Sequence, residues 1–139
     1  MKSSVLPGLA LLFLLGWGFT PAHAAPTDYR FDPVTATVER GIAVTLKVEM
    51  RERAQNRLVP GAEMTEAHVD RSPDGRPDES HPAFFEPNPE YGVYRFRAAV
   101  PTDGNWALTF TAKILGEAQP IAANVTFTAV EPGQTVVKR

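Results

Sequence analysis

The side chains best suited to bind a metal ion lie in the polar middle of the chain. They are Met64, His68, Asp70 and His81. Imidazole and carboxylate groups are ligands for Cu(II) or Zn(II), and a thioether adds a soft ligand. On an extended strand, Met64, His68 and Asp70 point to one face, because side chains alternate with a period of two. A turn at Pro73-Asp74-Gly75 would return the chain and bring His81 near His68. The sequence therefore predicts a candidate metal site from these four residues.

The spacing of these residues also fits a second interpretation, in which they are solvated residues of a loop or a strand edge. At about 3.3 Å per residue, Met64 and His68 are roughly 13 Å apart along a strand, so they share an ion only if the strand bends. His68 and Asp70 are about 7 Å apart, which lets their side chains converge. Both interpretations remain open at this point.

Composition excludes several classes of protein. The chain has 139 residues and no cysteine, so disulfides, thiolate metal sites and type-1 copper centres are excluded. Lys and Arg number 14 against 16 Asp and Glu, a balance that gives no basic footprint for nucleic acid. The sequence also lacks a nucleophile elbow, a P-loop and a Rossmann glycine pattern. We therefore expect a protein that is not an enzyme and does not bind nucleic acid.

The first 24 residues have the features of a Sec-type signal peptide. Lys2 supplies a positive charge, an apolar run follows over residues 5–19, and Ala22-His23-Ala24 offers small residues for cleavage. An apolar run of about 15 residues is shorter than the roughly 20 that a membrane-spanning helix needs. We expect cleavage after Ala24, location in the periplasm and no membrane span afterwards.

The rest of the chain has the pattern of short β-strands. Proline and glycine interrupt it about every dozen residues, which leaves little room for helices of ordinary length. Apolar residues alternate with polar ones in four segments, 42–50, 94–100, 106–111 and 121–129. Residues 34–38 and 62–70 are expected to add further strands. This pattern predicts an all-β, immunoglobulin-like antiparallel sandwich of about seven strands over residues 34–130. Residues 25–33 form an N-terminal segment and 131–139 a C-terminal tail.

Glycine and aromatic residues at fixed spacing connect the chain with a known family. Val59-Pro60-Gly61-Ala62 opens a strand, and Gly92-Val93-Tyr94 and Gly104-Asn105-Trp106-Ala107-Leu108 follow later. This arrangement resembles the YtkA-like and FixH-like domains, which are small exported immunoglobulin-like sandwiches. Many members carry a Met-Pro-x-Met segment in the middle stretch, which this sequence lacks.

The resemblance implies accessory work in the cell envelope. Members are often associated with copper or with assembly of haem enzymes, so copper becomes the possible cofactor of Met64, His68, Asp70 and His81. The expected function is a non-catalytic accessory protein that binds copper or assists assembly of a metal-dependent envelope complex. The alternative is a periplasmic interaction module without metal, which binds an envelope protein complex or a transport component.

Overall fold

The computed structural model describes residues 28–133. The predicted signal peptide and the last six residues of the predicted tail lie outside this range. Within residues 28–133, no helix is both long enough and apolar enough to cross a membrane.

The described chain is built from β-strands, which confirms the predicted all-β class. The strands are β1 (Tyr29–Pro33), β2 (Thr37–Glu39), β3 (Gly41–Glu52), β4 (Arg57–Leu58), β5 (Glu63–Arg71), β6 (Arg76–Glu86), β7 (Val93–Val100), β8 (Gly104–Lys113) and β9 (Ile121–Val130). A short 3-10 turn, η3 (Ser72–Asp74), joins β5 to β6. The predicted strands at 94–100, 106–111 and 121–129 correspond to β7, β8 and β9.

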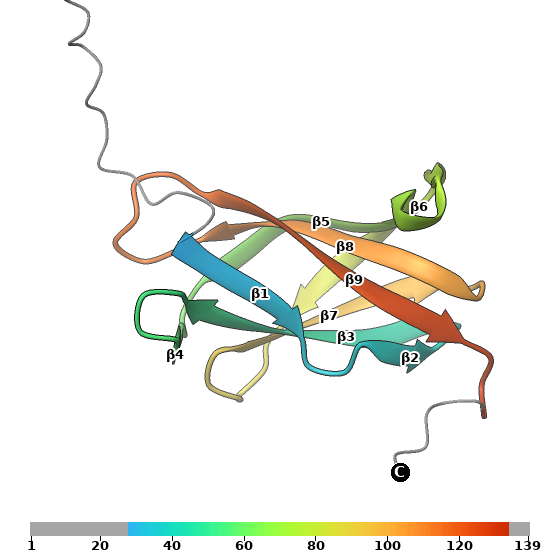
Figure 1. Ribbon diagram of the computed structural model, residues 1–139, viewed down its shortest axis with the longest axis horizontal. Coiled ribbons are helices and arrows are strands. Elements are labelled where there is room, and N and C mark those ends of the chain that lie inside the picture. The colour runs from blue at the N-terminus through green and yellow to red at the C-terminus, as the bar shows by residue number, and fades with distance from the viewer. Residues whose placement is uncertain (1–27, 134–139) are drawn as a thin grey trace, which may run out of the picture.

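The strands form one continuous, curled sheet rather than a flat one (Figure 1). Hydrogen bonding follows the order β1-β3-β7-β6-β5-β8-β9-β2, with β4 paired to β3. All pairs are antiparallel except β2 with β9. The curl places the apolar faces of the β3–β7 and β8–β9 regions toward a shared core. The immunoglobulin-like sandwich remains a prediction.

Strand β6 makes the sheet continuous, and it lies in the polar middle of the chain. Its first part pairs with β5, and this pairing ends at Pro82 opposite His68. Its last part, from Ala83 to Glu86, pairs with β7 instead. Proline has no N–H to donate to a sheet. Pro82 therefore suits the point at which the strand changes partners.

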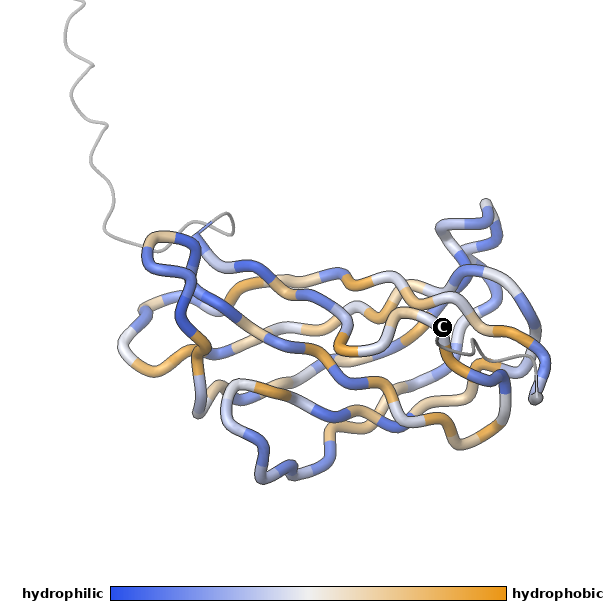
Figure 2. Tube along the Cα trace, turned by 60° about the horizontal axis from the view of Figure 1, so that its bottom comes forward, coloured by the Kyte–Doolittle hydropathy of each residue, from blue (hydrophilic) through white to orange (hydrophobic). Residues whose placement is uncertain are grey.

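Alternating apolar residues of the later strands form most of the core. Trp106 is 1 % exposed, which confirms that it is a core residue, and no polar or charged residue among those described is fully buried. Phe31, Phe96 and Phe110 lie in contact, with ring centroids 5.5 Å (Phe31–Phe110) and 5.0 Å (Phe96–Phe110) apart. Figure 2 shows the alternation as short orange and blue segments along the strands. Burial of such side chains contributes roughly 1.5–3 kcal/mol each and supplies the main stabilisation.

The alternation predicted from residue 42 fails at the start of β3. Gly41 pairs with Val100 and Val44 with Ala98, so Ile42 and Ala43 together oppose one residue of β7. This is a β-bulge, which shifts the side-chain phase by one position. As a result Ile42 is 83 % exposed although it is apolar and in phase with the core residues that follow.

The strand predicted at 34–38 is divided in the structure. β1 ends at Pro33 beside β3, and β2 begins at Thr37 beside β9. Between them, the Val34 N–H donates to the Lys47 carbonyl (2.9 Å) and the Ala36 carbonyl accepts from Thr128 (2.8 Å). The chain thus crosses from one edge of the sheet to the other. The sheet begins at Tyr29, before the expected boundary at residue 34.

Candidate functional site

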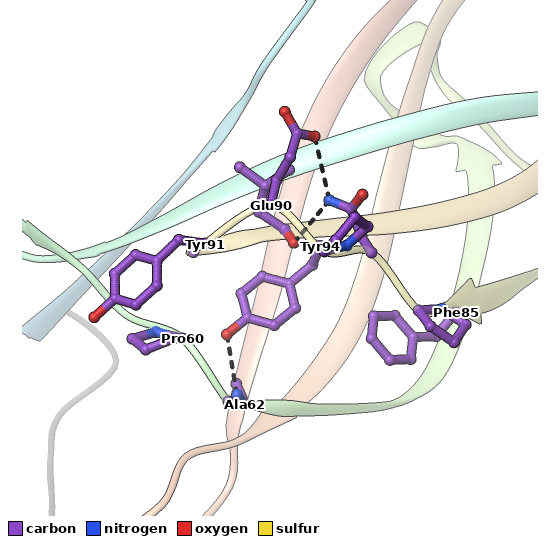
Figure 3. Close-up of a pocket in the computed structure, with 12 residues that line it drawn as sticks. Pro60, Ala62, Phe85, Glu90, Tyr91 and Tyr94 are labelled. Atoms are coloured by element: carbon purple, nitrogen blue, oxygen red, sulfur yellow. Dashed lines mark hydrogen bonds between the residues drawn. The ribbon is translucent and has the colours of Figure 1, made fainter.

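A pocket of about 360 Å³ opens at the end of the molecule that carries the β6–β7 loop (Figure 3). Three parts of the chain line it: residues 60–62 before β5, Phe85 near the end of β6, and residues 87–94. The lining is rich in proline and aromatic side chains. Concave surfaces that carry such side chains bind apolar groups of ligands or of other proteins.

Tyr94 fixes one wall of this pocket. Its hydroxyl donates to the Val59 carbonyl (2.7 Å) and accepts from the Ala62 N–H (3.0 Å), as Figure 3 shows for Ala62. Burial raises the pKa of Tyr94, so the hydroxyl keeps its proton for the bond to Val59. The tyrosine of the G-x-Y motif therefore holds the segment that leads into β5 against β7.

The glycine of the same motif permits close packing of the loop on β4. Gly92 has φ +74°, and a Cβ at this position would lie 2.7 Å from the Cβ of Leu58. Its carbonyl accepts from the Met50 N–H at 3.0 Å. A side chain here would both clash and require a backbone conformation that L-residues rarely adopt. The close approach of this loop to Leu58 therefore requires glycine at position 92.

Polar side chains tie down the loop that forms the pocket rim. Glu90 accepts from the Lys47 ammonium at 3.0 Å and from the Asn88 amide at 3.3 Å. The bond from Lys47, followed by that from Asn88, lowers the pKa of Glu90. Asn88 also donates to the Val93 carbonyl (3.1 Å). The polar groups of the rim therefore bond to one another. The aromatic side chains of the rim are left as the groups that can contact another molecule.

A second hollow of about 670 Å³ adjoins the first, and Pro60 and Tyr91 line both. Its far side includes Ile114 and Leu115 of the β8–β9 connection. Tyr91 is 66 % exposed and Leu115 is 90 % exposed. The second hollow is also lined by polar side chains, those of Arg51, Glu52, Asn56 and Arg57. We call the apolar residues that line the two adjoining hollows the loop-end surface: Pro60, Phe85, Tyr91, Ile114 and Leu115.

Two of the four predicted metal ligands lie in contact. The His68 Nε2 is 3.2 Å from Asp70 Oδ2, on the outer face of β5. Burial of the Asp70 carboxyl acts to raise its pKa. Hydrogen bonds from Ser72, and then from His68, outweigh this effect, and the pKa is lowered. The carboxylate also accepts from the Ser72 N–H (2.9 Å). The predicted convergence of His68 and Asp70 is therefore found.

Met64 and His81 lie elsewhere. Glu66 has φ +53°, and Glu66 and Ala67 oppose a single residue of β8, so β5 carries a bulge. The bulge turns Met64 into the core, where it is 5 % exposed, while His68 stays on the outer face. The expectation that Met64 shares a face with His68 fails for this reason.

His81 lies opposite Val69, whose side chain is fully buried, and its ring stacks near Trp106 with centroids 5.8 Å apart. Residues opposite each other on antiparallel strands point to the same face, so His81 faces inward while His68 faces outward. The hairpin does return, as predicted, but its register keeps the imidazoles on different faces.

These positions do not bring the four predicted donors to one copper ion. Among residues 28–133, no group of three or more His, Cys, Asp and Glu side chains is arranged to hold a metal. The donors present at His68 and Asp70 supply one imidazole and one carboxylate, fewer than the ligands of a closed protein site.

The G-x-W motif organises the opposite end of the molecule. Asp74 accepts from the Asn105 N–H (2.8 Å), the Asn105 side-chain amide (3.0 Å) and Arg71 (3.0 Å). These three bonds, led by the backbone N–H, lower the pKa of Asp74. A Cβ on Gly104 would lie 2.5 Å from the Asp74 carboxylate. The Trp106 indole then packs under Arg71, whose guanidinium carbon lies 5.9 Å from the ring centroid. This network holds the turn between β5 and β6 against the start of β8.

Sequence reasoning found Tyr94 and Trp106 as motif residues but missed Phe85 and Tyr91 as surface residues. Neither of these two belongs to a chemical motif, and only folding brings residues 60–62, 85 and 87–94 together. The available signal was the cluster of Pro60, Pro87 and Pro89 around aromatic residues.

Comparisons with known proteins give one family match. The family model described as YtkA-like matches residues 23–111, which include both glycine–aromatic motifs. No curated protein matches the chain. A solved structure titled "ZirS C-terminal Domain" is similar with a TM-score of 0.43 and 9 % identity, over 94 % of this chain and 84 % of that one.

Proposed function

Because the chain belongs to the YtkA-like family, we propose that it is an exported, non-catalytic accessory domain that binds a partner protein through the loop-end surface. Export and periplasmic location are supported by the signal-peptide features of residues 1–24. An immunoglobulin-like sandwich of the FixH-like kind is consistent with the curled sheet and its single core.

One observation carries this proposal: large apolar side chains gather on the surface instead of in the core. Tyr91 and Leu115 are 66 % and 90 % exposed, and they line a hollow together. Phe85, 39 % exposed, lies in the adjoining pocket. Contiguous exposed apolar surface bordered by polar groups is typical of interaction sites. Tyrosine is enriched in the centres of such interfaces.

Copper binding is the second candidate, and the contact between His68 and Asp70 favours it. The remaining predicted donors, Met64 and His81, lie in the core and on the inner face. A metal site would therefore need ligands from a partner. Metal analysis of protein purified from the periplasm without an affinity tag tests this, and a stoichiometric metal that is lost on His68→Ala would support it.

Site-specific photo-crosslinking in the cell envelope tests the proposed function. A photoreactive phenylalanine analogue replaces Tyr91, and the matched control carries it at Ile42, which is also apolar and exposed. We expect one protein, identified by mass spectrometry, to be crosslinked from position 91 and not from 42. The crosslink should persist in chelator. Equal crosslinking from both positions, or none, would contradict the proposal, and loss in chelator would favour metal handling.

A further inference from the structure

His68 and Asp70 form one half of a four-coordinate metal site on the outer face of β5. The His68 Nε2 lies 3.2 Å from Asp70 Oδ2, and 43 % of the histidine side chain is exposed. In a tetrahedral Zn(II) site, with metal–ligand bonds of about 2.0–2.2 Å, two neighbouring ligand atoms lie about 3.3–3.5 Å apart. A small rotation of the imidazole therefore lets both donors bind one ion.

A hydrogen bond to the backbone orients the carboxylate of this pair. Asp70 Oδ1 accepts from the Ser72 N–H at 2.9 Å, which leaves Oδ2 directed to His68. Hydrogen bonds of this kind to a ligating carboxylate are typical of the groups that surround protein metal sites, because they fix the ligand in place. The two donors are therefore already positioned by the fold.

The side chains around this pair are small and uncharged. Residues that lie opposite each other on neighbouring antiparallel strands point to the same face. The register therefore gives the neighbours of the pair on this face: Ser80 and Pro82 of β6, Ala107 and Thr109 of β8, and Asn124 and Thr126 of β9. β5, β8 and β9 lie side by side (Figure 1). Another sheet face can approach this one closely, and these neighbours do not repel a cation.

Two such faces bring enough ligands to one ion. Packed sheets lie about 10 Å apart, so an ion midway is about 5 Å from each backbone. An aspartate side chain and a metal–oxygen bond of about 2 Å together span that distance, and the longer imidazole reaches the same point. A two-fold axis through the ion then supplies two imidazoles and two carboxylates, which complete a tetrahedral site. The two carboxylates balance the charge of the divalent ion.

We propose that two copies of this chain pack through the outer face of β5, β8 and β9 and hold one Zn(II) ion between them, bound by His68 and Asp70 of each copy. The second copy supplies the ligands that Met64 and His81 do not. Without the ion, the two carboxylates would repel each other across the interface, so pairing of the chains depends on the metal. This proposal is independent of the loop-end surface.

Sedimentation velocity and calorimetry of the periplasmic protein, purified without an affinity tag, test the proposal. We expect a monomer in EDTA, a dimer in Zn(II), and one Zn(II) bound for every two chains. Mg(II) is the control ion and should leave a monomer, because it prefers an octahedral set of oxygen ligands. Binding of one Zn(II) by each monomer, no binding of Zn(II), or an equally stable dimer in EDTA would each overturn the proposal.

Variants of the ligands connect the ion to this pair. Asp70→Asn retains an oxygen that accepts from Ser72 and removes the charge, and Asp78→Asn makes the same change at an exposed position of β6. We expect Asp70→Asn and His68→Ala to weaken Zn(II) binding by about 100-fold or more and to abolish the dimer. Asp78→Asn should leave both unchanged. A zinc-dependent dimer that survives loss of either ligand would contradict the assignment.

A further variant tests the face without changing the ligands. Asn124→Arg places a long cationic side chain at an exposed position of β9 on the same face, and Ile42→Arg does so at an exposed position of β3. We expect the first to weaken the zinc-dependent dimer about tenfold or more, because like charges then meet across the interface, and the second to leave it unchanged. Equal dimers in the two variants would overturn packing through this face.

The outcomes are distinct from those of the proposed function. Crosslinking from position 91 without a zinc-dependent dimer would overturn only the metal-bridged pair. A zinc-dependent dimer without that crosslink would support the metal-bridged pair and contradict only the proposed function.

Discussion

Tyr94→Phe removes a single hydroxyl and tests how the pocket is held together. The hydroxyl bonds to the Val59 carbonyl at 2.7 Å and to the Ala62 N–H at 3.0 Å. Ala62 is only 7 % exposed, so water has little access to its N–H after the change. A buried donor without a partner costs about 1–3 kcal/mol, and a lost ordinary hydrogen bond about 0.5–1.5 kcal/mol. The free energy of unfolding should fall by about 2–3 kcal/mol.

Tyr91→Phe is the matched control. It removes the same atom from a tyrosine in the β6–β7 loop, three residues before Tyr94, that is 66 % exposed. Its effect should therefore stay within about 0.5 kcal/mol. Urea unfolding followed by circular dichroism gives both free energies on one scale. Because a change of 1 kcal/mol shifts the midpoint of a domain this size by about 4–8 °C, thermal unfolding provides an independent check. Equal losses in the two variants would refute the role of Tyr94 as the residue that holds the pocket wall.

Three further predictions concern the backbone and the charge network. Gly104→Ala should lower the free energy of unfolding by about 1–3 kcal/mol, because the position has φ +130° and its Cβ would meet a carboxylate at 2.5 Å. Gly116→Ala, with φ +92° and open space around it, should cost less in the same thermal unfolding assay. Glu66→Gly should raise the free energy of unfolding by about 0.5–1 kcal/mol, because glycine adopts the φ of +53° at this position without strain. Urea unfolding measures this change, and a loss of stability would show that the backbone at the bulge is not strained. The pKa of Asp74 is lowered in the fold, so its contribution to stability is complete above its ordinary value of 3.8 and is lost as the pH falls below it. In Asp74→Asn, the free energy of unfolding should therefore fall less steeply as the pH is lowered from about pH 5 to pH 2. An unchanged slope would show that protonation of Asp74 does not cause the loss of stability in acid.

The alternation of side chains predicted the later strands well. β7 and β9 bury alternate residues without interruption. β8 does so except at Ala107, which is buried between Trp106 and Leu108. Each of these strands pairs with neighbours along most of its length. Under that condition the period of two, which is a local property of the chain, is enough to place a residue inside or outside.

The same alternation gives the wrong face at two positions, Ile42 and Met64. In each case a bulge lies between the residue and the part of the strand from which alternate positions are counted. A bulge depends on how many residues the partner strand sets against the segment, which the segment alone does not encode. This explains why His68 and Asp70, two residues apart and beyond the bulge, were correctly expected to converge, while Met64 was not.

The sequence by itself determined the all-β class, the core aromatics and the glycine–aromatic motifs, because alternation and turn residues act over a few neighbouring positions. The tertiary structure decided the face that His81 occupies, the two partners of β6 and the surface where Phe85 and Tyr91 meet Pro60. Those features depend on strand register and on loops that are distant along the chain. Their energies arise only when the whole sheet has formed.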